Sequence, residues 1–256
     1  MKTYSVTDVG RKRESNQDFV YCTAEPVGRL MNLFIVADGM GGHNAGDYAS
    51  RFAAQEFVHC VQNSAKKTVI STIEDAICQT NHELLKKAQE NEELSGMGTT
   101  FVVSTVDKNT LYVANIGDSR LYLIRQDKIR QITQDHSLVE EMIRRGEVRR
   151  EEARFHPNKN VITRALGANV DIVPDFFEVK LLPEDVILMC SDGVSNMVDD
   201  AEILSIIREY RGDVEKAGQQ LLMKANEYGG RDNISILLVA DFSEPLLTTP
   251  DGAEMR

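Results

Sequence analysis

The chain has 256 residues, of which 42% are apolar and 27% charged, and it carries a net charge of −11. This fits a globular protein with a sizeable core, and the acidic balance argues against a nucleic-acid partner, which needs a basic surface. Because no apolar run approaches the roughly 20 residues that cross a bilayer, and the N-terminus lacks a signal-peptide apolar region, we expect a cytoplasmic protein without a membrane span.

The four cysteines are scattered and form no CxxC pair. Each lies in an apolar stretch, which is typical of reduced core cysteines and not of a disulfide framework or a zinc site. They are Cys22, Cys60, Cys78 and Cys190.

In the first half of the chain, short strands precede two long helices, and strands follow them. Apolar residues recur at helical spacing from Ala49 to Val61 and from Ile70 to Ala88, each set on one face. The period then changes to that of strands, and tight turns at Lys108–Asn109 and near Gly117–Asp118 predict an antiparallel meander. The predicted strands are residues 2–8, 18–24, 30–37, 98–107, 110–119, 120–128 and 129–133.

In the second half, a charged helix is predicted first, then strands, a helix pair and a closing strand. Because strands and helices come in segregated runs, the pattern indicates an α+β fold: two antiparallel sheets packed face to face, with helix pairs outside. The helices are predicted at residues 137–154, 200–209 and 213–228, the strands at 175–181, 185–193 and 233–242, and a frayed tail at 243–256.

Four aspartates stand at strand ends, three of them beside a glycine: Asp38, Asp118, Asp192 and Asp232. Gathered together they would repel one another, and their pKa values would rise unless cations were present. Carboxylates, backbone carbonyls and water suit Mg²⁺ or Mn²⁺ and not zinc. The alternative is that each Asp-Gly pair is only a turn, since the sequence alone does not show that the four converge.

The stretch VGRKRESNQDFV adds Arg13, Asn16 and Asp18 ahead of a predicted strand. An arginine offers a forked set of donors that suits phosphate, and Asp18 is placed to hold a metal-bound water. The alternative is an ordinary charged turn.

Together these segments resemble the PP2C (PPM) family of metal-dependent serine/threonine protein phosphatases, in its compact bacterial branch. The resemblance implies a four-layer αββα sandwich as a single catalytic domain over residues 1–242, with a flap at about 137–165 and the metal ions at one edge of the two sheets. The matching segments follow the family's order over residues 1–241: GRKRESNQD, FIVADGMGGHNAG, GMGTTFV, LYVANIGDSRLYLI, ITQDHS, ITRALG, ILMCSDGVS and GGRDNISILLV.

The resemblance also implies a role for each aspartate. Asp38 matches the residue that bridges two metal ions, and Gly39 matches the residue that binds through its carbonyl. Asp192 and Asp232 match the other carboxylates of the binuclear centre. Asp118 matches the position that, with Asp192, holds a third and weaker ion in bacterial members.

For the reaction, the resemblance implies attack on phosphoserine or phosphothreonine by a hydroxide that bridges the two ions, formed from a water whose pKa the ions lower toward neutrality. Arg13 matches the phosphate-binding arginine, and Asp18 the acid reached through a metal-bound water. Met40 stands where many animal members carry a histidine thought to act as general acid, and methionine cannot donate a proton. We therefore expect a metal-bound water as the acid, with His43 as the weaker alternative.

The other four histidines are expected on helix surfaces or in loops, and not as metal ligands. They are His59, His82, His136 and His156.

The predicted flap is basic in an acidic protein. Residues 141–164 hold seven Lys/Arg against four Glu, a surplus of +3. Either this is a solvated helix face or it attracts the phosphorylated region of a substrate. The basic residues are Arg144, Arg145, Arg149, Arg150, Arg154, Lys159 and Arg164.

The resemblance further implies phosphoproteins as substrates, a serine/threonine kinase as partner and a monomeric state. Two alternatives stay open at this point. One is a catalytically silent relative that only binds phosphoproteins, and the other is a small-molecule phosphomonoesterase with the same centre.

Overall fold

The computed structural model describes residues 1–42, 45–153 and 155–242. The strands are β1 (Lys2–Asp8), β2 (Asp18–Thr23), β3 (Leu33–Met40), β4 (Gly98–Thr99), β5 (Phe101–Asp107), β6 (Thr110–Ile116), β7 (Arg120–Arg125), β8 (Lys128–Gln131), β9 (Asp175–Lys180), β10 (Val186–Cys190) and β11 (Ile234–Ala240). The helices are α1 (Ala45–Gln62), α2 (Val69–Glu90), α3 (Leu138–Arg144), α4 (Arg150–Ala153), α5 (Asp192–Ser195), α6 (Asp200–Glu209) and α7 (Val214–Glu227), with a 3₁₀ turn η1 (Glu92–Leu94).

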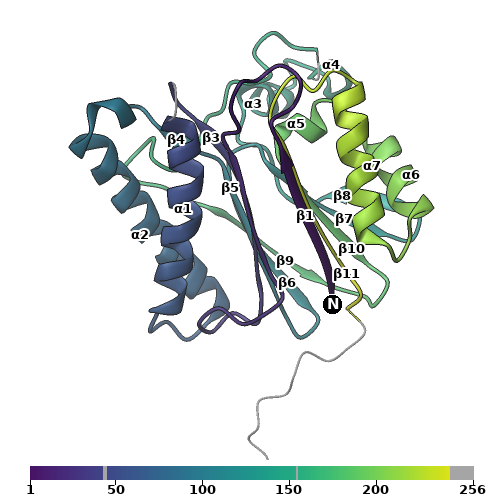
Figure 1. The fold of residues 1–256 in the computed structure, drawn as a ribbon, viewed down its shortest axis with the longest axis horizontal. Helices are drawn as coiled ribbons and strands as arrows, with labels where there is room; N and C mark the ends of the chain where they lie inside the picture. The colour runs from purple at the N-terminus through teal and green to yellow at the C-terminus, as the bar shows by residue number, and fades with distance from the viewer. Residues whose placement is uncertain (43–44, 154, 243–256) are drawn as a thin grey trace, which may run out of the picture.

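Two sheets pack between two helix layers, so the predicted αββα sandwich is confirmed (Figure 1). One sheet has the order β1-β11-β10-β7-β8, and the other has the order β2-β3-β5-β6-β9, with β4 paired to β3. Every strand pair is antiparallel. Helices α1 and α2 cover the second sheet, whereas α6 and α7 cover the first (Figure 1).

Strand β3 shows how the sequence produces these layers. Side chains alternate between the two faces of a strand, and in β3 Phe34 and Val36 face the opposite sheet while Ile35 and Ala37 face α1. Because both faces are covered, all four side chains are fully buried, and the strand is apolar without interruption. The end of β3, which includes Asp38, therefore emerges from the core at a fixed position.

The four strands predicted as one meander are divided between the two sheets, so that prediction was wrong. β6 pairs with β5 and β9, whereas β7 pairs with β10 and β8. The chain crosses over after Gly117, whose φ is +104° and whose Cβ, if present, would lie 2.6 Å from Thr100 Cβ. A strand with alternating apolar residues has the same sequence pattern whether it stays in one sheet or joins the other. The crossover places Asp118 at the edge of the sandwich.

Three boundaries also differ from prediction. β3 continues to Met40 because β4 pairs with its end, so Asp38 lies inside the strand. Asp192 begins α5 and does not end a strand. The helix predicted at 137–154 is two short helices, separated by a turn in which Gly146 has a φ of +74°.

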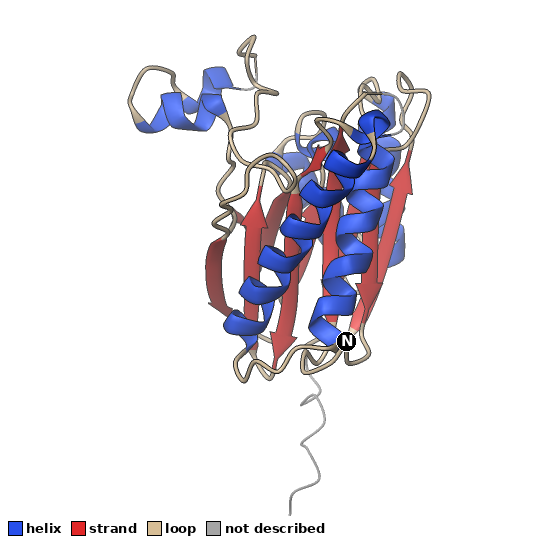
Figure 2. Ribbon diagram, turned by 90° about the vertical axis from the view of Figure 1, so that its left-hand side faces the viewer, coloured by secondary structure: helices blue, strands red, loops and turns tan. Residues whose placement is uncertain are grey.

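The segment with α3 and α4 projects from one end of the sandwich (Figure 2). Among the helices of residues 1–42, 45–153 and 155–242, none combines the length and apolar character that a bilayer crossing needs. The predicted tail at 243–256, like His43 and Arg154, lies outside the described residues.

Candidate active site

The strand pair β2–β3 brings two predicted site residues face to face. Asp18 and Asp38 are direct partners in the antiparallel register, where opposed side chains lie close and like charges repel. The N–H of Asp38 donates to Thr100 Oγ1 at 2.9 Å, and its carbonyl accepts from Thr99 Oγ1 at 3.0 Å. The two carboxylates are therefore held together by backbone pairing.

Gly39 occupies a position that admits no side chain. A Cβ built on it would lie 2.0 Å from the carbonyl oxygen of Gly46 and 2.6 Å from that of Gln17. Its N–H donates to the Gln17 carbonyl at 3.0 Å. The first turn of α1 therefore packs directly on this strand, as only glycine permits.

Two further aspartates come from the other sheet. Asp192 begins α5 after β10, and Asp232 lies just before β11. Their segments approach closely because Gly193 has no side chain: a Cβ there would lie 1.9 Å from the carbonyl oxygen of the residue after Asp232. Ser191 links the two sheets, since its hydroxyl donates to Asp18 Oδ2 at 2.7 Å.

The predicted site residues, apart from Asp18, line one cavity of about 220 Å³. It lies at the end of the sandwich that holds the last residues of β3 and the start of α5 (Figure 1). Asp18 is only 3% exposed and lies beside Asp38. The lining also includes residues that sequence reasoning did not select, two of them from the flap. The lining residues are Arg13, Gln17, Asp38, Gly39, Met40, Gly41, Asp118, Asn160, Ile162, Asp192, Asp232 and Asn233.

Burial, and to a smaller extent mutual repulsion, raises the pKa values of four carboxylates at this end of the sandwich. The pKa of Asp18 rises to about 7 and that of Asp192 to about 6, while those of Asp38 and Asp118 rise well above the ordinary value. Beyond burial, Asp38 is repelled by Asp18, Asp192, Asp118 and Asp232. Burial and neighbouring charges thus destabilise the charged forms of Asp18, Asp38, Asp118 and Asp192.

Unsatisfied oxygens show that this cluster fits a cation. Asp18 Oδ1 and Asp192 Oδ1 are buried without a hydrogen-bond partner, and such atoms in a native structure call for an explanation. Among the described residues, no three His, Cys, Asp or Glu side chains are already arranged to hold an ion by themselves. A Mg²⁺ ion does not need such a group, because it commonly keeps several waters and takes one or two carboxylates.

Arg13 forms an ion pair with one carboxylate of the cluster. Its Nη2 donates to Asp232 Oδ2 at 2.8 Å, and its side chain is 52% exposed. The hydrogen bond to Asp232 raises the Arg13 pKa. Because a guanidinium has five N–H donors, Arg13 keeps donors that can meet an anion entering the cavity.

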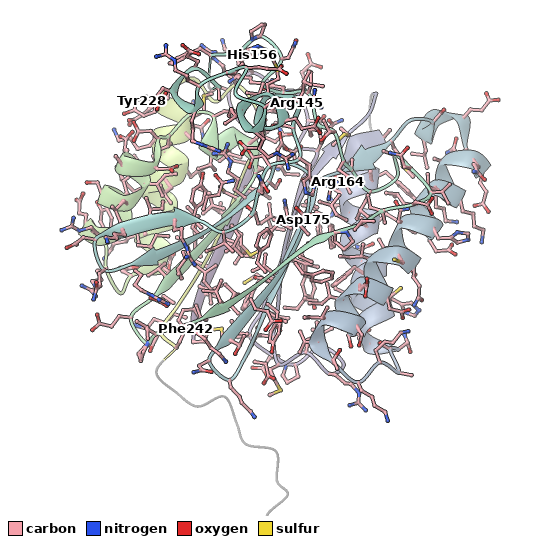
Figure 3. The ribbon with its side chains drawn as sticks, turned by 180° about the vertical axis from the view of Figure 1, so that it is seen from behind. Arg145, His156, Arg164, Asp175, Tyr228 and Phe242 are labelled. Atoms are coloured by element: carbon pink, nitrogen blue, oxygen red, sulfur yellow. The ribbon has the colours of Figure 1, made fainter. Side chains whose placement is uncertain are left out.

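The flap's basic side chains are largely neutralised. Arg145, Arg149 and Arg150 pair with Glu141, Glu152 and Glu140, and Arg164 pairs with Asp175 at 2.8 Å (Figure 3). Glu140 and Asp175 lie outside residues 141–164, so counting them reduces the surplus from +3 to +1. The pairs therefore weaken the idea that the flap attracts phosphorylated substrates and favour a solvated face.

His136, predicted only as a surface or loop residue, is a buried loop residue at the base of the flap. Its Nδ1 accepts from the Gly117 N–H at 3.0 Å, its Nε2 lies 3.1 Å from Asp175 Oδ2, and its carbonyl accepts from the Thr163 N–H at 2.8 Å. Burial lowers its pKa. No sequence signal separates such a histidine from an exposed one, because its partners are distant in the chain.

Comparisons with known proteins agree with this architecture. The family described as Protein phosphatase 2C matches residues 10–234. The serine/threonine phosphatase stp of Listeria innocua is 41% identical over 245 residues, covering 91% of this chain and 93% of that protein. The crystal structure of Stp1 from Staphylococcus aureus superposes with a TM-score of 0.87 at 34% identity, covering 93% of this chain and 94% of that one.

A further solved structure contains metal. The catalytic domain of the phosphatase PstP, in complex with two manganese ions, superposes with a TM-score of 0.81 at 29% identity, covering 93% of this chain and 96% of that one. The match of the family over most of the sequence, together with relatives well above 30% identity, leads to one conclusion. The chain belongs to the protein phosphatase 2C family of serine/threonine protein phosphatases.

Proposed function

We propose that this phosphatase removes phosphate from serine and threonine side chains of proteins with two divalent cations, Mn²⁺ or Mg²⁺. Asp38, the Gly39 carbonyl, Asp192 and Asp232 would hold them, and Asp118 with Asp192 would hold a third, weaker ion. One observation supports this most: four carboxylates and a bare glycine backbone line a single cavity. The raised pKa values of Asp38, Asp118 and Asp192 are what a bound cation would relieve.

When bound, such cations lower the pKa of water and polarise a phosphoryl group. The residues of the chain would do the rest. Arg13, at the rim, would donate to the phosphoryl oxygens and stabilise the charge that develops on them. Asp18, buried with Oδ1 free of partners, would accept a hydrogen bond from a water in the cavity. Met40 lines the cavity but cannot donate a proton, so the leaving oxygen would take its proton from water.

The partner and assembly state are also proposals. The phosphorylation that this enzyme reverses would come from a serine/threonine kinase, as the resemblance implies. The protein would act as a monomer, as the resemblance also implies. Light scattering at micromolar concentration tests the second point, and a stable dimer would refute it.

The direct test is a manganese-dependent assay on a phosphothreonine peptide. Asp38→Ala should lower kcat by at least about 10³-fold, because it removes the central ligand, and EDTA should abolish turnover until Mn²⁺ is restored. Asp127→Ala is the matched control, since Asp127 pairs with Arg208 at the surface and should leave kcat unchanged.

The outcomes separate the alternatives. An Asp38→Ala enzyme that kept most of its activity would refute the metal centre. A wild-type protein that binds the phosphopeptide without turnover would be the silent relative. Faster hydrolysis of sugar phosphates than of phosphopeptides would indicate a small-molecule phosphomonoesterase.

A further inference from the structure

The flap contributes one polar side chain to the catalytic cavity that the proposed chemistry does not use. Three neutral amide side chains line that cavity: Gln17, Asn160 and Asn233. Asn233 is fully occupied, because its Nδ2 donates to the carbonyls of Val9 and Ser15 at 2.9 Å and its Oδ1 accepts from the Gln17 N–H at 2.8 Å. Gln17 has a partner of its own.

Asn160 differs from both. It is exposed, and within the described parts of the chain its side chain has no hydrogen-bond or ion-pair partner. A carboxamide offers two donors and an acceptor. Asn160 is therefore the amide of this cavity whose hydrogen-bonding groups are all open to a ligand.

The position of Asn160 is fixed by the base of the flap. Two residues further on, Ile162 forms an isolated β-bridge with Ser137. The Leu138 N–H donates to the Val161 carbonyl at 2.8 Å, which ties the same two segments together. Because the side chain stands next to this hydrogen-bonded bridge, it is presented to the cavity by an ordered backbone.

The size of the cavity indicates which part of a substrate Asn160 meets. A space of about 220 Å³ accommodates a phosphoryl group and a threonine side chain, so the main chain of a phosphoprotein must stay at the rim. The phosphoryl group is already provided for by Arg13 and the proposed cations. What remains for a neutral amide at the rim is a peptide group, whose N–H and carbonyl complement a carboxamide.

We propose that Asn160 hydrogen-bonds the main chain of the phosphorylated residue and so selects peptide phosphate esters over other phosphate monoesters. This inference rests on the proposed function. Asn160 is then a substrate-binding residue on the flap, and its loss should act mainly through KM, because the contact is present before and during the reaction.

The test compares three substrates with saturating Mn²⁺: a phosphothreonine peptide with uncharged flanks, N-acetyl-phosphothreonine N-methylamide, and p-nitrophenyl phosphate. The first two carry peptide groups next to the phosphorylated residue, and the third carries none. Asn160→Ala should lower kcat/KM for both peptide substrates about tenfold more than for the aryl ester, as expected for one or two hydrogen bonds.

Asn158→Ala is the matched control. Asn158 is an exposed asparagine of the same turn, two residues away, and it does not line the catalytic cavity. Its substitution should leave the ratio of peptide to aryl-ester kcat/KM within about twofold of wild type.

Equal losses on all three substrates would overturn the proposal, because they would indicate a contact with phosphate or a disturbed flap. A loss confined to the long peptide, or no loss at all, would overturn it as well. Failure of the proposed function would look different, since the wild-type enzyme would then hydrolyse neither peptide substrate efficiently with Mn²⁺.

Discussion

The protein contains two kinds of buried carboxylate, and they are treated differently. Asp135 accepts from the Arg120 Nε and Nη2 atoms at 2.7–3.1 Å, and Asp185 accepts from the Arg125 Nε and Nη2 atoms at 2.8 and 2.7 Å. By contrast, the carboxylates of the catalytic end form no ion pair within the described residues, except Asp232 with Arg13. These unpaired carboxylates are Asp18, Asp38, Asp118 and Asp192.

Asp135 and Asp185 show that this fold can neutralise a buried carboxylate with a guanidinium. A paired guanidinium satisfies both oxygens with good geometry. Where the chain leaves four such groups unpaired around one cavity, it forgoes stability, and strongly perturbed groups of this kind cluster at functional sites. Substitutions at a paired and at an unpaired carboxylate test this difference.

On the paired side, Asp185→Ala should lower the free energy of unfolding by about 3 kcal/mol, because it leaves the Arg125 guanidinium without its carboxylate in a partly buried position. The Asp185 side chain is 1% exposed and also accepts from the Leu182 N–H. Urea unfolding monitored by circular dichroism measures the loss, and kcat at 25 °C should stay near wild type. A change below about 1 kcal/mol would show that the pair is not structural.

On the unpaired side, the prediction concerns pH. The pKa of Asp18 is raised to about 7 and that of Asp192 to about 6, so the folded state holds protons that the unfolded state releases. Stability of the metal-free protein should therefore fall as pH rises from about 5 to 8, by on the order of 2 kcal/mol. Asp38→Asn, which removes the central charge, should flatten this slope.

The measurement is thermal melting in EDTA at several pH values for wild type and Asp38→Asn. His136, whose lowered pKa acts in the opposite direction, is present in both proteins and cancels from the comparison. Identical slopes, or a wild-type protein that gains stability with pH, would show that the carboxylates do not repel one another.

Sequence reasoning reached the fold class because its signals are local. The apolar run of β3 and the helical spacing in α1 and α2 each depend on residues a few positions apart. The prediction was wrong at the β6–β7 connection, because β7 leaves the sheet of β6 and joins the other sheet. That choice is made by the close approach of Gly117 to Thr100, 17 residues apart in the sequence, and no periodicity records it.

In the site, the aspartates could be selected from the sequence, but the residues that lie next to them could not. Asp38, Asp192 and Asp232 were selected by their place beside strands, and the structure brings them to one cavity. The hydroxyl of Ser191, which joins Asp18 to the opposite sheet, had no signal, because the contact spans 173 residues. Asn160 had no sequence signal either, because its approach to the aspartates depends on the path of the flap in the folded chain.

The smallest expected effect concerns the basic side chains of the flap. Like Asp135 and Asp185, several of them form an ion pair: Arg145, Arg149, Arg150 and Arg164. Arg144 is the exception, because it is exposed and has no carboxylate partner among the described residues. Arg144→Glu should raise KM for an acidic phosphopeptide about twofold at low ionic strength, and the effect should vanish at about 0.5 M salt, where charges are screened within a few ångströms. Arg149→Ala is the control, since that side chain already pairs with Glu152 and surface pairs contribute little. A salt-independent rise in KM would point to a direct contact with the substrate, and no rise at all would show that the flap charges are purely structural.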